Sequence, residues 1–141
     1  LGLVETYLEN YKEAVSYFNN AIKQNRSNPE YYYNLANVYF KQGELALAKR
    51  NYNLAISICP ENQNYHFALA NLYYSEKHYK KALEELEGDF FEARFLKAVI
   101  LYETGYLALA RKELSELALE YPNREMVNEY MTRINSELGL N

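Results

Sequence analysis

The chain has 141 residues, a length typical of one domain, and a net charge of −4 from 15 Lys and Arg against 19 Asp and Glu. Because non-specific affinity for nucleic acid comes from cationic contacts with phosphates, this acidic balance argues against nucleic acids and anionic membrane surfaces as partners. No apolar run reaches the ~20 residues of a membrane-spanning helix, and no signal-peptide pattern opens the chain.

A repeat of 34 residues sets the order of the predicted elements. Ala14, Ala48 and Ala82 are each 34 residues apart, and Ala110 follows after 28. A second series marks the preceding helix of each unit: Gly2, Ala36, Ala70 and Ala98. Because small residues at fixed places let two helices approach closely, the repeat predicts stacked helical hairpins. With only 5 Gly and 3 Pro in the chain, the connections should be short.

The first two units differ in completeness. Residues 1–28 form a partial unit that begins at Leu1 and lacks most of its first helix. This exposed half-repeat suggests that upstream repeats or a partner cover it. Residues 29–62 form the most complete unit, with a first helix, a turn at Gly43 and a second helix that stops at Pro60.

The third unit, residues 63–89, is shortened. Lys77 stands where the turn glycine is expected, and six residues are missing after Leu86. A short second helix is therefore expected here. Asp89, with a glutamate three residues later, is typical of an N-cap with its capping-box partner, so the next helix should start near Phe90.

The fourth unit, residues 90–122, is followed by one last segment, residues 123–138. The segment carries an apolar stripe at helical spacing: Met126, Val127, Tyr130, Met131, Ile134 and Leu138. Its opposite side is polar, as the terminal capping helix of a repeat array requires.

These motifs resemble those of the tetratricopeptide repeat family, whose unit is two antiparallel helices. The central unit matches the family pattern at these residues: Tyr32, Leu35, Ala36, Tyr39, Gly43, Ala48, Tyr52, Ala55 and Pro60. The resemblance implies an all-α fold, a right-handed superhelical solenoid of helix pairs with a C-terminal capping helix, in a single domain over residues 1–141. It also implies a non-catalytic adaptor or scaffold that binds a protein partner.

In the resembled family, the first helices line a concave groove that holds peptide segments. The equivalent places here carry two aromatic rows, asparagines and one cation: Tyr33, Phe67 and Phe95; Phe40, Tyr74 and Tyr102; Asn34, Asn37, Asn64 and Asn71; and Lys41. Aromatic rings bury area with little loss of entropy, and asparagine offers a peptide backbone both a donor and an acceptor. The alternative is that some of these rings pack between adjacent first helices. The Lys and Arg pairs that clamp a C-terminal carboxylate in some family members are absent from these units, although upstream repeats could supply them.

No arrangement of residues predicts a catalytic site, a metal site or a cofactor. His66 occupies an aromatic packing place, and His78 lies in a predicted turn. Cys59 ends a helix, where the helix dipole disfavours a thiolate. One acidic cluster is interpreted as a solvated helix face: Glu84, Glu85, Glu87 and Asp89.

Three other functions stay open at this point. The chain could be a self-associating module that stacks as a homo-oligomer through its uncapped N-terminal end. It could be an RNA-binding helical repeat, although the acidic balance argues against that, or an accessory region of a larger protein. The single cysteine is compatible with a reducing compartment, and a cytoplasmic location is favoured.

Overall fold

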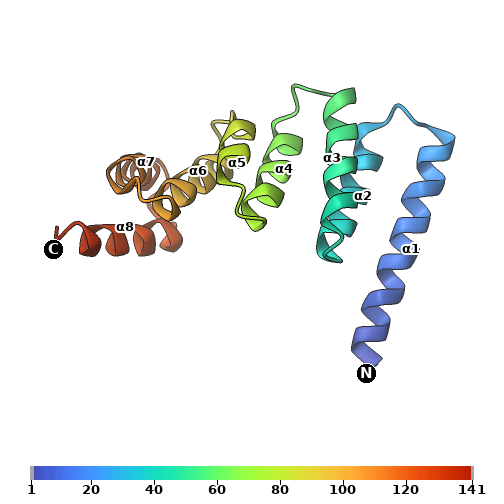
Figure 1. Cartoon of the computed structure of the whole chain (residues 1–141), viewed down its shortest axis with the longest axis horizontal. Coiled ribbons are helices and arrows are strands. Elements are labelled where there is room, and N and C mark those ends of the chain that lie inside the picture. The colour runs from blue at the N-terminus through green and yellow to red at the C-terminus, as the bar shows by residue number, and fades with distance from the viewer. Residues whose placement is uncertain (1, 141) are drawn as a thin grey trace. The chain divides into compact units, whose positions relative to one another are not determined.

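The computed structural model describes residues 2–140, and their side chains from residue 8 onward. The start of the first unit at Leu1 and the predicted packing role of Gly2 therefore lie outside the described residues. The described residues form helices and no strand (Figure 1), which confirms the all-α repeat fold. The helices are α1 (Gly2–Gln24), α2 (Pro29–Lys41), α3 (Leu45–Ile58), α4 (Gln63–Ser75), α5 (Tyr79–Glu85), α6 (Phe91–Glu103), α7 (Leu107–Glu120) and α8 (Glu125–Glu137). None of them is long and apolar enough to cross a bilayer.

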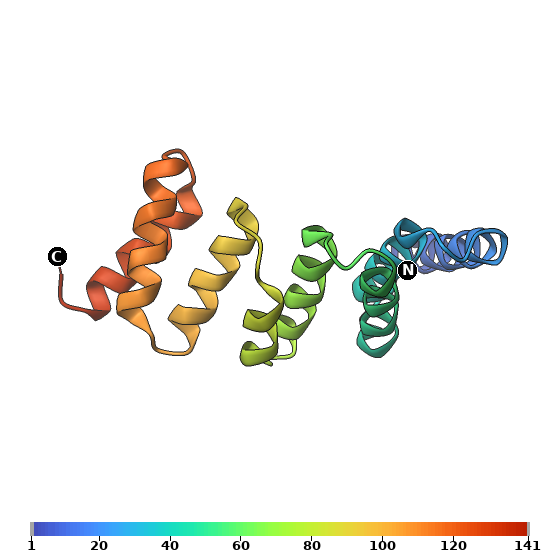
Figure 2. The ribbon, with the colours of Figure 1, turned by 90° about the horizontal axis from the view of Figure 1, so that it is seen from above.

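Tertiary contacts divide the chain into two compact units, residues 1–72 and residues 73–141, with the boundary inside α4. In the first unit, α2 packs against both α1 and α3. In the second unit, α7 packs against α6 and α8, and α5 contacts α6. Figure 2 shows α6 and α7 as neighbouring helices joined by a short turn.

The repeated alanines are the most deeply buried residues of both units. The following have no exposed surface: Ala36, Ala48, Ala55, Ala70, Ala82, Ala98 and Ala110. A methyl side chain at these points lets the partner helix approach closely, and larger residues beside them fill the gaps. The predicted packing role of the two alanine series is therefore confirmed, except that Ala14 on α1 is only half-buried.

A residue in the left-handed conformation closes the turn between the helices of each hairpin. Gly43 has φ +78° and Gly105 has φ +85°. Lys77, at the equivalent place of the third hairpin, adopts φ +60° although it has a Cβ atom. The turn is thus formed even where the glycine is missing, and the strain that a side chain meets in this region is borne by Lys77.

Asparagine caps open two of the first helices. The Asn28 side chain accepts a hydrogen bond of 3.0 Å from the Glu30 amide, and the Asn62 side chain accepts one of 3.0 Å from the Asn64 amide. The predicted Asp89 cap is wrong, because Phe90 is the N-cap of α6 and provides no side-chain cap. The Asp89 carboxylate instead pairs with Arg94, at 3.7 Å from Nε.

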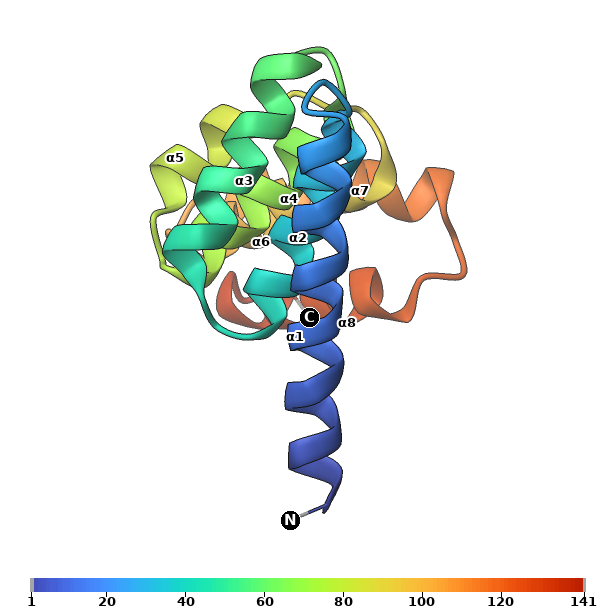
Figure 3. The same cartoon turned by 90° about the vertical axis from the view of Figure 1, so that its right-hand side faces the viewer.

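The first helix differs from the expected half hairpin. α1 is continuous over 23 residues, and Figures 1 and 3 show its N-terminal part projecting beyond the ends of α2 and α3. Glu9 occupies the place that corresponds to Gly43, so the chain has no glycine there to leave the helical conformation. A helix continues through such a stretch because each added residue gains a backbone hydrogen bond.

The shortened third hairpin is confirmed. α5 has 7 residues, whereas α3 and α7 have 14 each. The chain then runs without regular structure through residues 86–90 before α6 begins.

The last helix, α8, packs mainly on α7. Val127 and Ile134 are buried, and Tyr130 and Met131 are half-buried. The buried part of the predicted apolar stripe is shorter than expected, since Met126 at one end is 44% exposed and Leu138 at the other is 39% exposed. The predicted capping position is thus occupied by a helix with one buried face.

Candidate functional site

One face of α2 carries three of the predicted groove residues of the first unit. Tyr33, Asn37 and Phe40 follow one another at helical spacing, and all three are half-buried. The Tyr33 ring centroid lies 4.9 Å from that of Tyr65 and 6.0 Å from that of Tyr52. This ring therefore packs partly between α2 and α4, which is the alternative considered from the sequence, and keeps part of its surface exposed.

Asn37 is held in place by a buried phenol. The Tyr52 hydroxyl donates a 2.6 Å hydrogen bond to Asn37 Oδ1, and Tyr52 is 2% exposed. Burial, with a smaller contribution from Tyr33, raises the pKa of Tyr52 far above its usual range. Because the phenol stays protonated, it acts as a constant donor that fixes the orientation of the Asn37 amide.

A second buried phenol joins α4 to the start of α2. The Tyr65 hydroxyl donates to a Glu30 carboxylate oxygen across 35 residues of sequence. Burial and this hydrogen bond raise the pKa of Tyr65. Neither Tyr65 nor Glu30 was predicted as part of the site, although Tyr65 directly precedes the His66 packing place.

The other predicted residues of the first unit are spread along α2 and α4. Asn34, Phe67 and Asn71 are half-buried, whereas Lys41 and Asn64 are exposed. Among the described residues, no side-chain hydrogen bond involves Asn34 or Asn71.

In the second unit, the predicted rings of α6 meet the capping helix. The Phe95 ring stacks on Phe91 at 5.7 Å and meets the Tyr130 ring edge-on at 5.6 Å. Tyr102 also meets Tyr130 edge-on, at 5.5 Å, and its hydroxyl donates to Glu137. α8 thus engages both predicted residues of α6.

Tyr74, the remaining predicted residue, lies at the C-terminal end of α4. Its ring centroid is 5.9 Å from that of Tyr79. Burial raises the pKa of Tyr74. This half-buried ring packs at the turn that Lys77 closes.

The isolated histidines and the cysteine make local contacts. His66 Nε2 lies 2.7 Å from the Pro60 carbonyl oxygen, and His78 Nδ1 lies 3.4 Å from a Glu76 carboxylate oxygen. The Cys59 thiol donates to Glu61 at 3.3 Å, and this hydrogen bond raises the pKa of the thiol. Within the described residues, no cluster of His, Cys, Asp and Glu has the arrangement of a metal site.

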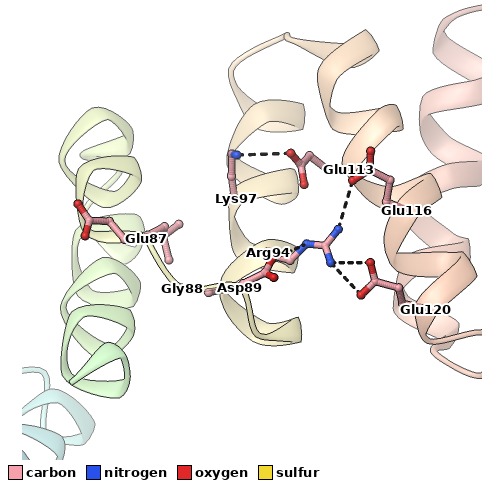
Figure 4. Close-up of a pocket in the computed structure, with 10 residues that line it drawn as sticks. Glu87, Gly88, Asp89, Arg94, Lys97, Glu113, Glu116 and Glu120 are labelled. Atoms are coloured by element: carbon pink, nitrogen blue, oxygen red, sulfur yellow. Dashed lines mark hydrogen bonds and ion pairs between the residues drawn. The ribbon is translucent and has the colours of Figure 1, made fainter. Parts of the chain in front are cut away.

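A polar pocket of about 410 Å³ lies in the second unit, between the link after α5 and the facing sides of α6 and α7 (Figure 4). Arg94 is central to it. Its guanidinium donates to both carboxylate oxygens of Glu120 at 2.9 Å and to Glu116 at 3.3 Å. Lys97 pairs with Glu113 at 3.4 Å. Sequence reasoning missed this network, because its members lie on different helices and share no local motif.

Two family models match the N-terminal part of the chain. One is described as a TPR repeat and matches residues 2–43, and the other is described as a tetratricopeptide repeat and matches residues 29–62. No curated protein matches the chain in sequence.

Solved structures similar to this chain include a tetratricopeptide repeat protein from Parabacteroides merdae, at 20% identity and a TM-score of 0.80, with 99% of this chain and 57% of that chain covered. YrrB, described as a TPR protein with an unusual peptide-binding site, gives 19% identity and a TM-score of 0.77, with 99% and 75% covered. MamA gives 12% identity and a TM-score of 0.84, with 99% and 85% covered. At such identities the likeness shows the fold alone, and this chain spans just over half the length of the Parabacteroides protein.

Proposed function

Because this chain belongs to the tetratricopeptide repeat family of protein–protein interaction modules, we propose that it is a non-catalytic adaptor that binds a peptide segment of a partner protein. The proposed binding face is the exposed side of α2 and α4 in the first unit. It comprises Tyr33, Asn34, Asn37, Phe40, Phe67 and Asn71.

The observation that carries the proposal is the fixed amide of Asn37. Its Oδ1 atom accepts the Tyr52 hydroxyl, so its Nδ2 hydrogens are the groups left to donate to a ligand. A peptide carbonyl oxygen is the natural acceptor. Because the amide is already oriented, a ligand that binds it loses little further side-chain entropy.

The neighbouring rings supply the apolar part of the contact. Tyr33, Phe40 and Phe67 each keep part of their surface exposed. Half-buried rings that are held by their neighbours are well suited to contact a ligand's side chains, since little freedom remains to be lost. An amide donor flanked by such rings suits a peptide better than a highly charged ligand.

The test uses peptides selected from a displayed library of random twelve-residue peptides, with affinities measured by fluorescence polarisation. Asn37→Asp keeps an acceptor for Tyr52 and removes the amide donors. It should weaken binding by roughly 5- to 30-fold, as expected for the loss of one or two hydrogen bonds. Asn37→Ala is a poorer probe, since it would also leave the buried Tyr52 hydroxyl without its acceptor.

The matched control is Asn53→Asp, the same change at an exposed position of α3. It should leave affinity unchanged. If Asn37→Asp and wild type bind every selected peptide equally well while the fold is intact by circular dichroism, the proposed face is wrong.

A further inference from the structure

A second groove lies on the other side of α2, between α1 and α3. Two cavities, of about 270 Å³ and 410 Å³, lie along it and share Tyr39 and Leu47 in their linings. Tyr39 belongs to the same stripe of α2 as Tyr32 and Leu35. At about 3.6 residues per turn, this stripe lies roughly half a helical turn away from Asn37. This groove is therefore distinct from the face proposed above.

The α3 side of this groove is exposed and apolar. Leu47 is 40% exposed, Leu54 is 38% exposed and Ile58 is 39% exposed, and the three follow one another at helical spacing. Large aliphatic residues gathered on one face of a helix are typical of an interaction surface.

Two cations stand along the same groove. Lys12 of α1 lines the larger cavity, and Arg50 of α3 lines the smaller one. Both are exposed, and neither forms an ion pair with any residue that the structure describes. Glu44 is the one acidic residue that lines the two cavities. The groove thus combines an apolar surface with an excess of positive charge, in a chain of net negative charge.

The second unit carries different residues at the positions equivalent to this groove. By the repeat spacing, Tyr32 and Leu35 correspond to Arg94 and Lys97 of α6. The α3 positions Leu54 and Ile58 correspond to Glu116 and Glu120 of α7. Figure 4 shows Arg94 paired with Glu116 and Glu120 across the pocket, and Lys97 paired with Glu113. In the second unit, the charged side chains of α6 and α7 that line the pocket pair with one another. In the first unit, the equivalent groove is apolar and the cations at its edge have no ion-pair partner among the described residues.

We propose that the groove between α1 and α3 binds an acidic peptide segment of a partner protein that carries large apolar side chains. The apolar side chains contact Leu47 and Leu54, and the carboxylates pair with Lys12 and Arg50. Charge complementarity selects acidic over basic segments, and burial of the exposed α3 stripe supplies the affinity.

The test is selection from the same displayed library, followed by fluorescence polarisation of individual peptides that bind. The double variant Leu54→Glu with Ile58→Glu gives the first unit the residues of the second. It should weaken the binding of acidic, apolar peptides by at least about tenfold, because two apolar contacts are replaced by like charges. Arg50→Glu should weaken the same peptides, and raising the salt concentration should weaken them for wild type but not for Arg50→Glu.

Two controls separate this groove from the α2–α4 face. Leu109→Glu, at the α7 place equivalent to Leu47 and 53% exposed, should leave binding unchanged. Asn37→Asp should also leave it unchanged, so failure of one proposal does not decide the other. Arg50 is exposed, so its variant decides the outcome even if the double variant does not fold.

Three results would overturn the proposal. One is selection of basic peptides, or of none that depend on Leu54 or Arg50. Another is equal affinity of wild type and Arg50→Glu for every acidic peptide. The third is a concentration-dependent dimer in sedimentation that Leu54→Glu abolishes, since a second copy would then occupy the groove.

Discussion

Lys77 shows how a single residue carries the cost of a departure from the repeat. At φ +60° it adopts the conformation that glycine adopts at Gly43 and Gly105. For an L-residue the left-handed region costs roughly 1–2 kcal/mol. The turn between α4 and α5 forms nevertheless, with hydrogen bonds from the Lys77 amide to the Tyr74 carbonyl oxygen at 2.9 Å and from the His78 amide to the Tyr73 carbonyl oxygen at 2.8 Å.

Replacing Lys77 by Gly should stabilise the protein by roughly 0.5–1 kcal/mol. The relief of the backbone strain exceeds the added entropy of glycine in the unfolded chain. Urea unfolding followed by circular dichroism measures the change. The reverse control is Gly43→Ala, which meets no atom within 4 Å of the new Cβ and should cost about 1 kcal/mol for conformational reasons alone. A loss of stability in Lys77→Gly would contradict this account.

At the scale of elements, the shortening of α5 leaves a polar pocket beside α6 and α7. α5 ends at Glu85, half the length of α3 or α7. The side of α6 beyond it lines a polar pocket, where Arg94 contacts carboxylates of α7 and of the preceding link. Ion pairs thus hold α6 to α7 where two further turns of helix are missing.

Arg94→Met should therefore destabilise the second unit by about 1–2 kcal/mol. Arg94 is 12% exposed, so its loss leaves Glu116 and Glu120 close together without their shared cation. The cost stays below that of a fully buried pair, because both carboxylates are about half exposed. Chemical unfolding measures the loss.

The control for Arg94→Met is Lys112→Met, an exposed cation on α7 that should change stability by less than about 0.5 kcal/mol. Adding Glu120→Gln to Arg94→Met should recover part of the loss, since it removes one of the repelling charges. Additive effects of the two changes would mean that Arg94 and Glu120 do not interact in solution.

At the scale of the whole molecule, buried phenols link stability to pH. The pKa values of Tyr52, Tyr65 and Tyr74 are all raised, mainly by burial. The folded state therefore keeps protons that the unfolded state releases near pH 10. Below about pH 10 both states hold these protons and the contribution is complete. As pH rises toward the raised pKa values, the contribution is lost.

The free energy of unfolding should thus fall steeply above about pH 10. Phenolate absorbance near 295 nm and helical circular dichroism, followed together, check this. Part of the phenolate signal should appear only as the helices melt. Tyr52→Phe and Tyr65→Phe together should flatten the pH dependence of stability. Complete ionisation of all tyrosines with the helices intact would refute the account.

The peptide-binding and groove predictions also belong to the whole molecule, because each places a partner on one side of α2. The two sides differ in chemistry. One combines rings with a fixed amide at Asn37, and the other combines aliphatic residues with the cations Lys12 and Arg50. Adaptor function with two distinct peptide types is the expected consequence.

The sequence by itself determined the helical hairpins, the short α5 and the position of α8. Alanine spacing, turn residues and missing residues act locally or at a constant repeat distance, so they can be recognised without coordinates. Two predictions from the sequence were wrong: the N-cap at Asp89 and the half hairpin at the position of α1. A capping pattern and a truncated repeat both depend on where the neighbouring backbone turns.

Only the tertiary structure decided which side chains meet across helices. The Tyr52–Asn37 bond, the Arg94–Glu120 pair and the contact of Phe95 with Tyr130 join residues on different helices. Such pairs depend on the rotation of each helix about its axis and on rotamers, which repeat spacing does not specify. The groove between α1 and α3 also depends on tertiary structure, because residues of α1, α2 and α3 together line it.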